Sequence, residues 1–228
     1  MEQIGFIGTY DKKDLLLNVA YTFAQNGKKV LIVDATLMQR LKYIVPKIGN
    51  TNAYVSEFLG VDVALGFMNL GNIAQYLGNP NNLPYDFVFV DSDNLQTISS
   101  FMIPRMQKIY LVTSYEKYEL ERTMEILRIL NMPLKVTKVV YSPDIDDSHE
   151  TYFNQILSRT PVQLNKTKVL LADRSEDKKV VLENQMFNEI RYKHYSNQYK
   201  DGIEYLAALI GEGIVEQSDI KRVIRNSK

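Results

Sequence analysis

Short apolar runs rich in β-branched residues recur along this chain, and segments long enough to form amphipathic helices separate them. Strands that are apolar on both faces and alternate with helices indicate a parallel sheet covered on both sides. The sequence therefore predicts an α/β fold with a doubly wound, mostly parallel sheet. The expected strands are Ile4–Gly8, Val30–Asp34, Phe87–Asp91, Ile109–Thr113, Val136–Tyr141 and Val169–Ala172, with Val61–Leu65 as a further candidate.

Apolar side chains between these runs recur at helical spacing, which predicts helices that bury one face. Gly27 stands where a glycine would end the first of these helices. We interpret the stripes as core rather than as parts of a site. They are Leu16, Val19, Ala20 and Phe23, then Leu120, Met124, Leu127 and Leu130, and finally Tyr205, Leu206, Leu209 and Ile210. Gly, Asn, Pro and Asp in residues 48–60, 66–84 and 142–150 predict loops or loop-rich insertions.

Composition excludes several classes of function. The 228 residues carry 27 basic and 27 acidic side chains, so no global field draws in nucleic acid or anionic membrane. The absence of cysteine excludes disulfides, thiol catalysis and Cys-ligated zinc. Without a long apolar stretch or a leader, we expect a cytoplasmic protein. No boundary divides residues 1–228, so we expect one domain, whose tail, residues 214–228, can form a separate short helix.

The N-terminal part of the chain resembles the ParA/MinD family of P-loop NTPases. The resemblance rests on the pattern from Gly5 to Asp34, with Tyr85–Asp93 and Ile109–Leu130. The family's Walker A loop reads K-G-G-x-G-K-T-T and is followed by a helix that contains an asparagine. When Asn18 is placed on that asparagine, Lys12 falls on the P-loop lysine and Gly8 on the second glycine.

The rest of the loop departs from the family pattern. Ile7 replaces the signature lysine, Thr9 and Asp11 replace glycines, and Lys13 replaces the magnesium-binding hydroxyl. Tyr10 and Asp11 bring Cβ atoms where backbone N–H groups approach a phosphate. A carboxylate about 4 Å from a phosphate charge would cost about 4 kcal/mol, or roughly three decades of affinity, at an effective dielectric near 20.

The resemblance thus implies a degenerate nucleotide loop made by Gly8, Thr9, Tyr10, Asp11, Lys12 and Lys13. Two outcomes stay open: the loop binds no nucleotide, or it binds ATP or ADP with magnesium weakly. The alternative interpretation is a plain strand-to-helix turn, in which Asp14 is a carboxylate favoured by the helix dipole.

Two strand-end carboxylates are the remaining site candidates. Asp34 ends "KKVLIVD" and Asp91 ends "YDFVFVD". Ligand sites of open α/β sheets lie at the carboxyl ends of their strands. The resemblance implies that Asp34 and Asp91 are catalytic and bind magnesium if nucleotide binds. The other interpretation is that they only cap strands, and Asp91-Ser92-Asp93 departs from the family's D-x-P pattern.

Residues 177–214 look similar to the C-terminal part of TadZ/CpaE-like pilus-localisation proteins. With the altered loop, this implies a catalytically degenerate scaffold that localises or assembles a pilus, secretion or conjugation apparatus. The alternative is a slow Mg-ATPase that uses Lys12, Asp34 and Asp91. We expect a homodimer with protein partners in a larger apparatus, and recruitment to the membrane or the cell pole stays open.

Two groups of residues near the C-terminus have competing interpretations. Tyr192, Tyr195, Tyr199 and Tyr205 are better explained as core or interface aromatics than as the terminal tyrosine cluster of a kinase. The tail carries Ile220, Val223 and Ile224 on one helical face among basic residues. Such a helix binds a membrane surface, packs on a partner or stays solvated, and the small apolar face favours the last two. No signature predicts strong nucleic-acid binding.

Overall fold

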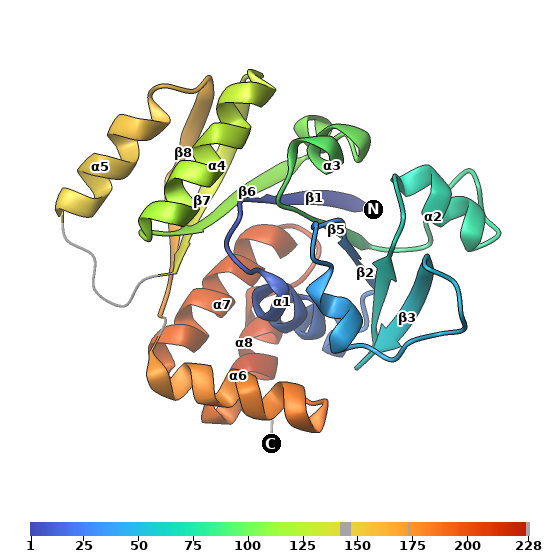
Figure 1. Cartoon of the computed structure of the whole chain (residues 1–228). Coiled ribbons are helices and arrows are strands. Elements are labelled where there is room, and N and C mark those ends of the chain that lie inside the picture. Colours follow the sequence, from blue (N-terminus) through green and yellow to red (C-terminus); the bar gives the residue numbers. More distant parts are fainter. Residues whose placement is uncertain (142–146, 173, 227–228) are drawn as a thin grey trace.

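A computed structural model describes residues 1–141, 147–172 and 174–226 (Figure 1). These residues form an eight-stranded sheet in the order β3-β4-β2-β5-β1-β6-β7-β8. All neighbouring strands are parallel except the β3–β4 hairpin. The strands are β1 (Glu2–Ile7), β2 (Val30–Asp34), β3 (Tyr54–Phe58), β4 (Val61–Leu65), β5 (Phe87–Ser92), β6 (Lys108–Ser114), β7 (Leu134–Tyr141) and β8 (Val162–Leu171). The predicted doubly wound, mostly parallel sheet is confirmed.

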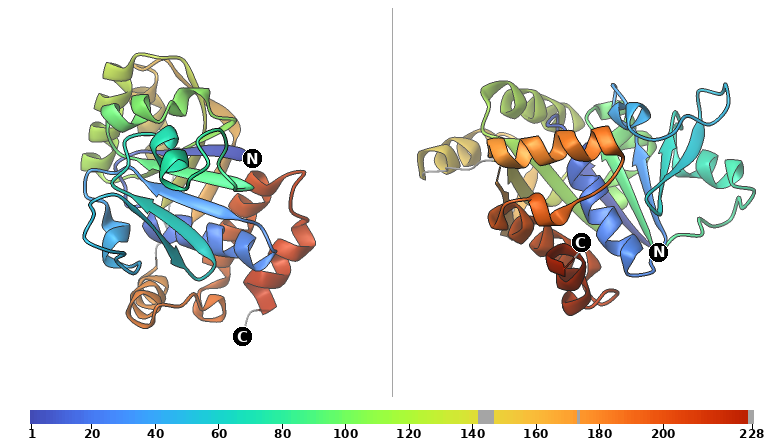
Figure 2. Two further views of the ribbon diagram at one scale, coloured as in Figure 1. Left: turned by 90° about the vertical axis from the view of Figure 1, so that its right-hand side faces the viewer. Right: turned by 90° about the horizontal axis from the view of Figure 1, so that it is seen from below.

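Helices cover both faces of the sheet (Figure 2). One face packs against α1 (Lys13–Gln25), α6 (Ser175–Phe187), α7 (Asn197–Gly211) and α8 (Gln217–Asn226). The other packs against α2 (Leu70–Tyr76), α3 (Leu95–Ser100), α4 (Lys117–Leu130) and α5 (Asp147–Leu157). Short 3₁₀ turns are η1 (Arg40–Tyr43), η2 (Ile103–Arg105) and η3 (Tyr192–His194).

The expected loop in residues 48–60 is wrong in part, because β3 lies there. In β3, buried and more exposed residues alternate, and the strand pairs antiparallel with β4 through a turn at Leu59 and Gly60, both with positive φ. Residues 66–84 likewise contain α2, whose N-terminus is capped by the Asn69 side chain. The third predicted loop lies outside the described residues over 142–146, and its last residues begin α5.

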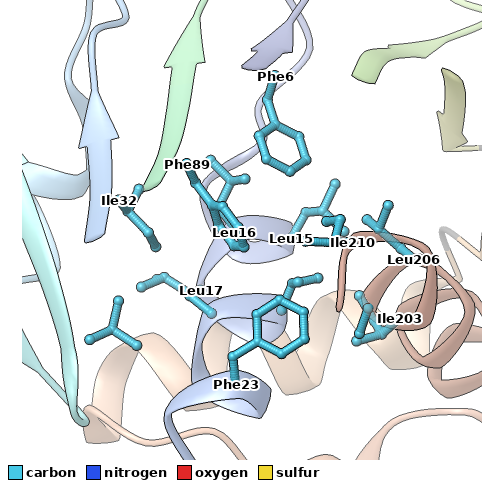
Figure 3. Close-up of a cluster of buried hydrophobic side chains, with 14 of the residues drawn as sticks. Phe6, Leu15, Leu16, Leu17, Phe23, Ile32, Phe89, Ile203, Leu206 and Ile210 are labelled. Carbon is cyan, nitrogen blue, oxygen red and sulfur yellow. The ribbon is translucent and has the colours of Figure 1, made fainter. Parts of the chain in front are cut away.

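The predicted helical stripes lie in the core. Leu16 and Phe23 of α1 are fully buried, as are Leu206 and Ile210 of α7 (Figure 3). Tyr205 differs, since its side chain is 47 % exposed. The core therefore joins the start of the chain to its end.

Three of the four C-terminal tyrosines are buried between α1 and the last helices, which confirms their interpretation as core aromatics. Tyr192, Tyr195 and Tyr199 are each at most 3 % exposed. Tyr195 and Tyr199 stack with ring centroids 4.5 Å apart. The Tyr192 hydroxyl lies 2.8 Å from Thr22 Oγ1 on α1. These contacts position α1, which carries the candidate nucleotide loop at its N-terminus.

The tail forms helix α8, and its apolar face packs on its own chain. Ile220 and Ile224 are fully buried against the cluster that contains α1 and α7, and Val223 is partly buried. The predicted helix is confirmed, but the expectation of a solvated or partner-bound face is wrong, because α1 and α7 bury it. No helix of the described residues is long and apolar enough to cross a membrane.

Candidate functional site

The candidate site lies where the central strands end. β5 pairs with both β1 and β2, so the loop after β1 meets the ends of both neighbours. Asp34 and Asp91 are register partners on adjacent strands, which brings the two carboxylates together as expected. Gly8 starts the loop with φ +123°, and a Cβ there would lie 2.2 Å from the Val112 backbone oxygen. Glycine is therefore needed at this position for packing against β6, whether or not a phosphate binds.

Lys12 points back into its own loop. Its side chain is buried, and Nζ donates hydrogen bonds to the backbone oxygens of Gly8 at 2.6 Å and Tyr10 at 3.1 Å. Nζ also lies 2.9 Å from Asp91 Oδ1. A lysine ammonium has three N–H donors, and the hydrogen bonds to Gly8 and Tyr10 use two of them. The contact with Asp91 is an ion pair in which Asp91 Oδ1 accepts no hydrogen bond. The lysine that would hold a phosphate is thus engaged by the protein itself.

Asp11 occupies the position where the start of α1 favours an anion. Its Oδ1 accepts from the Lys13 backbone N–H at 3.2 Å, and its Oδ2 accepts from Lys13 Nζ at 2.6 Å and Arg40 Nη1 at 2.7 Å. Backbone N–H groups and the helix dipole make such a terminus an anion site. Burial raises the pKa of Asp11, but the bonds from Lys13 and Arg40 outweigh it and lower the pKa below its usual value.

Asp34 organises the segment that follows β2. Its Oδ1 accepts from the Thr36 hydroxyl at 2.6 Å, and its Oδ2 accepts from the Leu41 backbone N–H at 3.0 Å. Burial raises the pKa of Asp34, although these hydrogen bonds oppose the rise. Its oxygens are therefore committed to holding η1, the turn that supplies Arg40.

Asp91 is the more strongly perturbed carboxyl. Burial raises its pKa to about 7, with Asp34 adding to the rise and Lys12 opposing it. No cluster of three or more His, Cys, Asp or Glu that could hold a metal ion occurs among the described residues. Asp34 and Asp91 would hold magnesium only with further oxygens from a bound nucleotide and water, because two carboxylates do not complete its octahedral set of ligands.

Thr9 and Tyr10 fasten the loop to distant elements. The Thr9 hydroxyl donates to Glu119 Oε2 on α4 at 2.6 Å, and the Thr9 backbone N–H donates to Thr123 Oγ1 at 3.2 Å. The Tyr10 ring stacks on Tyr141 at the end of β7, with centroids 4.6 Å apart. The loop is thus held by side-chain contacts on both sides.

The space left at the loop is small. A cavity of about 40 Å³ lies between residues 9–13 and the side chains of Asp34, Asp91 and Arg40. Small-molecule sites are usually about 300–1,000 Å³, so this cavity has room for little more than a water molecule. A second hollow of about 350 Å³ lies on the other side of the loop, between Tyr10, Tyr141 and α6. In this conformation the loop separates the two.

The structure brings the predicted site residues together, but it gives several of them unexpected partners. Residues 9–13 line one cavity with Asp34 of β2 and Asp91 of β5, and Gly8 packs against Val112 of β6. Sequence reasoning missed Arg40 and Glu119, which hold Asp11 and Thr9. Both are ordinary charged residues in exposed-looking segments, and no motif marks them.

No protein-family model and no curated protein matches the chain. Solved structures do match. The septum site-determining protein MinD from Pyrococcus horikoshii OT3, complexed with Mg-ADP, is 17 % identical with a TM-score of 0.61, over 92 % of this chain and 96 % of that one. A ParA family ATPase from Chlorobium tepidum TLS is 12 % identical with a TM-score of 0.60, over 90 % of this chain and 97 % of that one.

A chain of the Aquifex aeolicus MinC:MinD cell division protein complex is 15 % identical with a TM-score of 0.60, over 95 % of this chain and 98 % of that one. Likeness at such low identity concerns backbone architecture and not the chemistry of a site. The mostly parallel sheet with helices on both faces superposes on these ATPases over nearly the whole chain. The chain therefore has the P-loop NTPase fold of the MinD and ParA type.

Proposed function

We propose that this protein is a catalytically degenerate ParA/MinD-like scaffold that localises or assembles a larger apparatus and does not turn over ATP efficiently. One observation carries the proposal. The Lys12 ammonium donates hydrogen bonds to the backbone oxygens of Gly8 and Tyr10 and forms an ion pair with Asp91, beside a cavity of only about 40 Å³. A nucleotide phosphate would have to replace all three contacts and enlarge the cavity.

The charge arrangement around Lys12 supports the same conclusion. Asp11 places a carboxylate at the anion-binding end of α1 and pairs with both Lys13 and Arg40. Lys13 has no hydroxyl to offer magnesium. Binding energy that an active relative gains from glycines, lysine and hydroxyl is therefore either absent here or already used inside the protein.

Titration calorimetry with Mg-ATP and a phosphate-release assay test this proposal. We expect weak or no binding of ATP and ADP, and turnover at the background rate. Lys12→Ala is the matched variant, because it removes the ammonium and changes no other side chain of the loop. Turnover comparable to that of active relatives, abolished by Lys12→Ala, would refute the scaffold proposal.

A slow Mg-ATPase is the second candidate, and the placement of Lys12, Asp34 and Asp91 favours it. Lys12 contacts Asp91 directly, and Asp34 is the register partner of Asp91. In this reading Gly8–Lys13 cradle the phosphates, while Asp34 and Asp91 hold magnesium and the attacking water. It predicts magnesium-dependent ATP binding that is lost in Asp34→Ala. Absence of binding at millimolar ATP rules it out.

The proposed partners are a second copy of the chain and protein components of a pilus, secretion or conjugation apparatus, in the manner of TadZ/CpaE-like proteins. A MinD from Aquifex aeolicus occurs in a complex with MinC, so this fold does assemble with other proteins. The proposed location is the cytoplasm, with recruitment to the membrane or cell pole through a partner. Light scattering with and without Mg-ATP tests the dimer, and filter binding at low salt tests the expected lack of strong nucleic-acid binding.

A further inference from the structure

We infer that the outer edge of β8 is a docking site for an extended, acidic and partly apolar segment of a partner protein, which adds to the sheet as another strand. Such a docking site would serve the proposed scaffold role, on which the inference rests, but the surface lies away from the nucleotide loop.

The first observation is a strand edge without a neighbour. β8 runs from Val162 to Leu171 and, among the described residues, pairs with β7 alone. Edge strands present unpaired backbone N–H and C=O groups on one side, and these groups can pair with an added strand. β8 is twice as long as β3, the strand at the opposite edge of the sheet, with ten residues against five.

The second observation is a hollow of about 460 Å³ that runs around this edge. Lys168, Leu170 and Ala172 line one side of it, and α7 lines the other with Gln198, Asp201, Gly202 and Tyr205. The Asp201 carboxylate is already paired with Arg225 of α8. Side chains of a strand alternate between faces, and Val169 and Leu171 point into the core on the α7 face. Lys168 and Leu170 therefore point to the opposite face, so a hollow shared with α7 must pass along the outer edge of β8.

The walls of this hollow suit an apolar side chain next to an added backbone. Leu170 is 45 % exposed and Tyr205 is 47 % exposed, although both are large and largely apolar. A Cβ on Gly202 would lie 2.6 Å from the Leu170 backbone oxygen, so glycine lets α7 approach the strand closely. Alternate residues of an added strand would place one side chain between Leu170 and Tyr205.

The third observation is charge, which selects the occupant. The chain as a whole is neutral, yet residues 126–143 and 151–172, which include β7 and β8, contain no Asp or Glu. Exposed Lys135, Lys166 and Lys168 lie on these two strands. Lys168 Nζ already binds a carboxylate, that of Glu150 on α5, at 3.0 Å. An acidic segment therefore complements this edge.

A second copy of β8 is disfavoured as the occupant, because it would bring two lysine-rich strands together, and like charges opposite one another destabilise a strand pair. A nucleic acid would be attracted by the lysines but would leave the strand edge unpaired. The apolar walls and the free backbone groups both favour a polypeptide.

The test uses a fluorescein-labelled peptide of about nine residues that alternates valine and glutamate, the length of an ordinary strand. Fluorescence anisotropy at low salt should show binding to the full chain, and the matched valine–lysine peptide should bind at least tenfold more weakly. Lys166→Glu with Lys168→Glu should weaken binding of the acidic peptide at least tenfold. Lys42→Glu with Lys47→Glu, the same charge change on an exposed segment away from β8, should leave it within twofold.

Leu170→Ser with Tyr205→Ser tests the apolar walls and should also weaken binding at least tenfold, whereas Leu182→Ser, on an exposed part of α6, should not. Hydrogen exchange should slow in the β8 amides when the peptide binds. Three results overturn the inference. The first is no binding of the acidic peptide, and the second is equal binding of the valine–lysine peptide. The third is peptide binding that leaves the β8 amides unprotected and that a single-stranded oligonucleotide displaces. None of these results changes the nucleotide measurements that test the scaffold proposal.

Discussion

Replacing Asp11 with asparagine is expected to make the loop bind phosphate groups more tightly. In the wild-type chain the Asp11 carboxylate accepts hydrogen bonds from Lys13 and Arg40 at the start of α1. Asparagine has nearly the same size, so it removes the charge without opening the backbone. Arg40 then loses the carboxylate to which it donates, and Lys13 keeps only its ion pair with Asp14 at 3.2 Å.

The size of this effect follows from the geometry. An unscreened carboxylate about 4 Å from a phosphate charge costs about 4 kcal/mol at an effective dielectric near 20. The side chain of Asp11 is 26 % exposed and paired with Lys13 and Arg40, so solvent and these cations screen part of its charge. Halving the cost for this screening leaves about 2 kcal/mol, which is roughly a 30-fold gain in affinity. Salt should reduce the gain.

Titration calorimetry with Mg-ATP and with inorganic phosphate measures the gain at low and at high salt. Asp219→Asn is the control, because it removes the same charge from α8. The reasoning is refuted if Asp11→Asn binds no more tightly than the wild-type chain at low salt. It is equally refuted if Asp219→Asn produces the same gain, since the effect would then follow net charge and not the position of Asp11.

Three further outcomes are expected from urea unfolding. Burial raises the pKa of Asp91 to about 7, so the folded chain keeps a proton that the unfolded chain loses above about pH 4. The free energy of unfolding should therefore fall as pH rises from about 4 to 7. This fall should be smaller in Asp91→Asn, which cannot titrate at this position. Ile224→Ala should lower the free energy of unfolding by about 2–5 kcal/mol, because this side chain of α8 is fully buried in the cluster with α1 and α7. Gly8→Ala should lower the free energy of unfolding by about 1–3 kcal/mol because of its positive φ, and the clash with the Val112 backbone oxygen should add to this loss. Gly78→Ala is the control: its φ is also positive but its surroundings are open, so its loss should be smaller.

The parts of the fold that could be predicted from the sequence are those whose strands are buried on both faces. β2 and β5 are continuous apolar runs, and their burial is complete. β3 and the first half of β8 were missed because edge strands alternate polar and apolar residues and lack such runs. Their pairing depends on neighbours far along the chain, which a local pattern does not contain.

The candidate site divides in the same way. Asp34 and Asp91 could be placed together because parallel strands end at one edge of the sheet. The direction of the Lys12 side chain could not be predicted, since it depends on a hydrogen bond to Gly8 and a charge contact with Asp91. Arg40 reaches Asp11 from a 3₁₀ turn that Asp34 holds in place, and no sequence motif describes that arrangement.

The burial of α1 beneath the last two helices has a consequence for synthesis of the chain. Phe23 of α1 packs against Gly211 at the end of α7, and Ile224 of α8 belongs to the same cluster. A ribosome adding about 5–20 residues per second needs roughly 10–40 s to make the intervening part of the chain. For that time the side of the first helix that faces α7 and α8 has no native cover, although Phe23 can already stack on Phe87 of β5. The nascent chain should therefore bind chaperones until α7 emerges, and folding should be limited by contacts between its two ends.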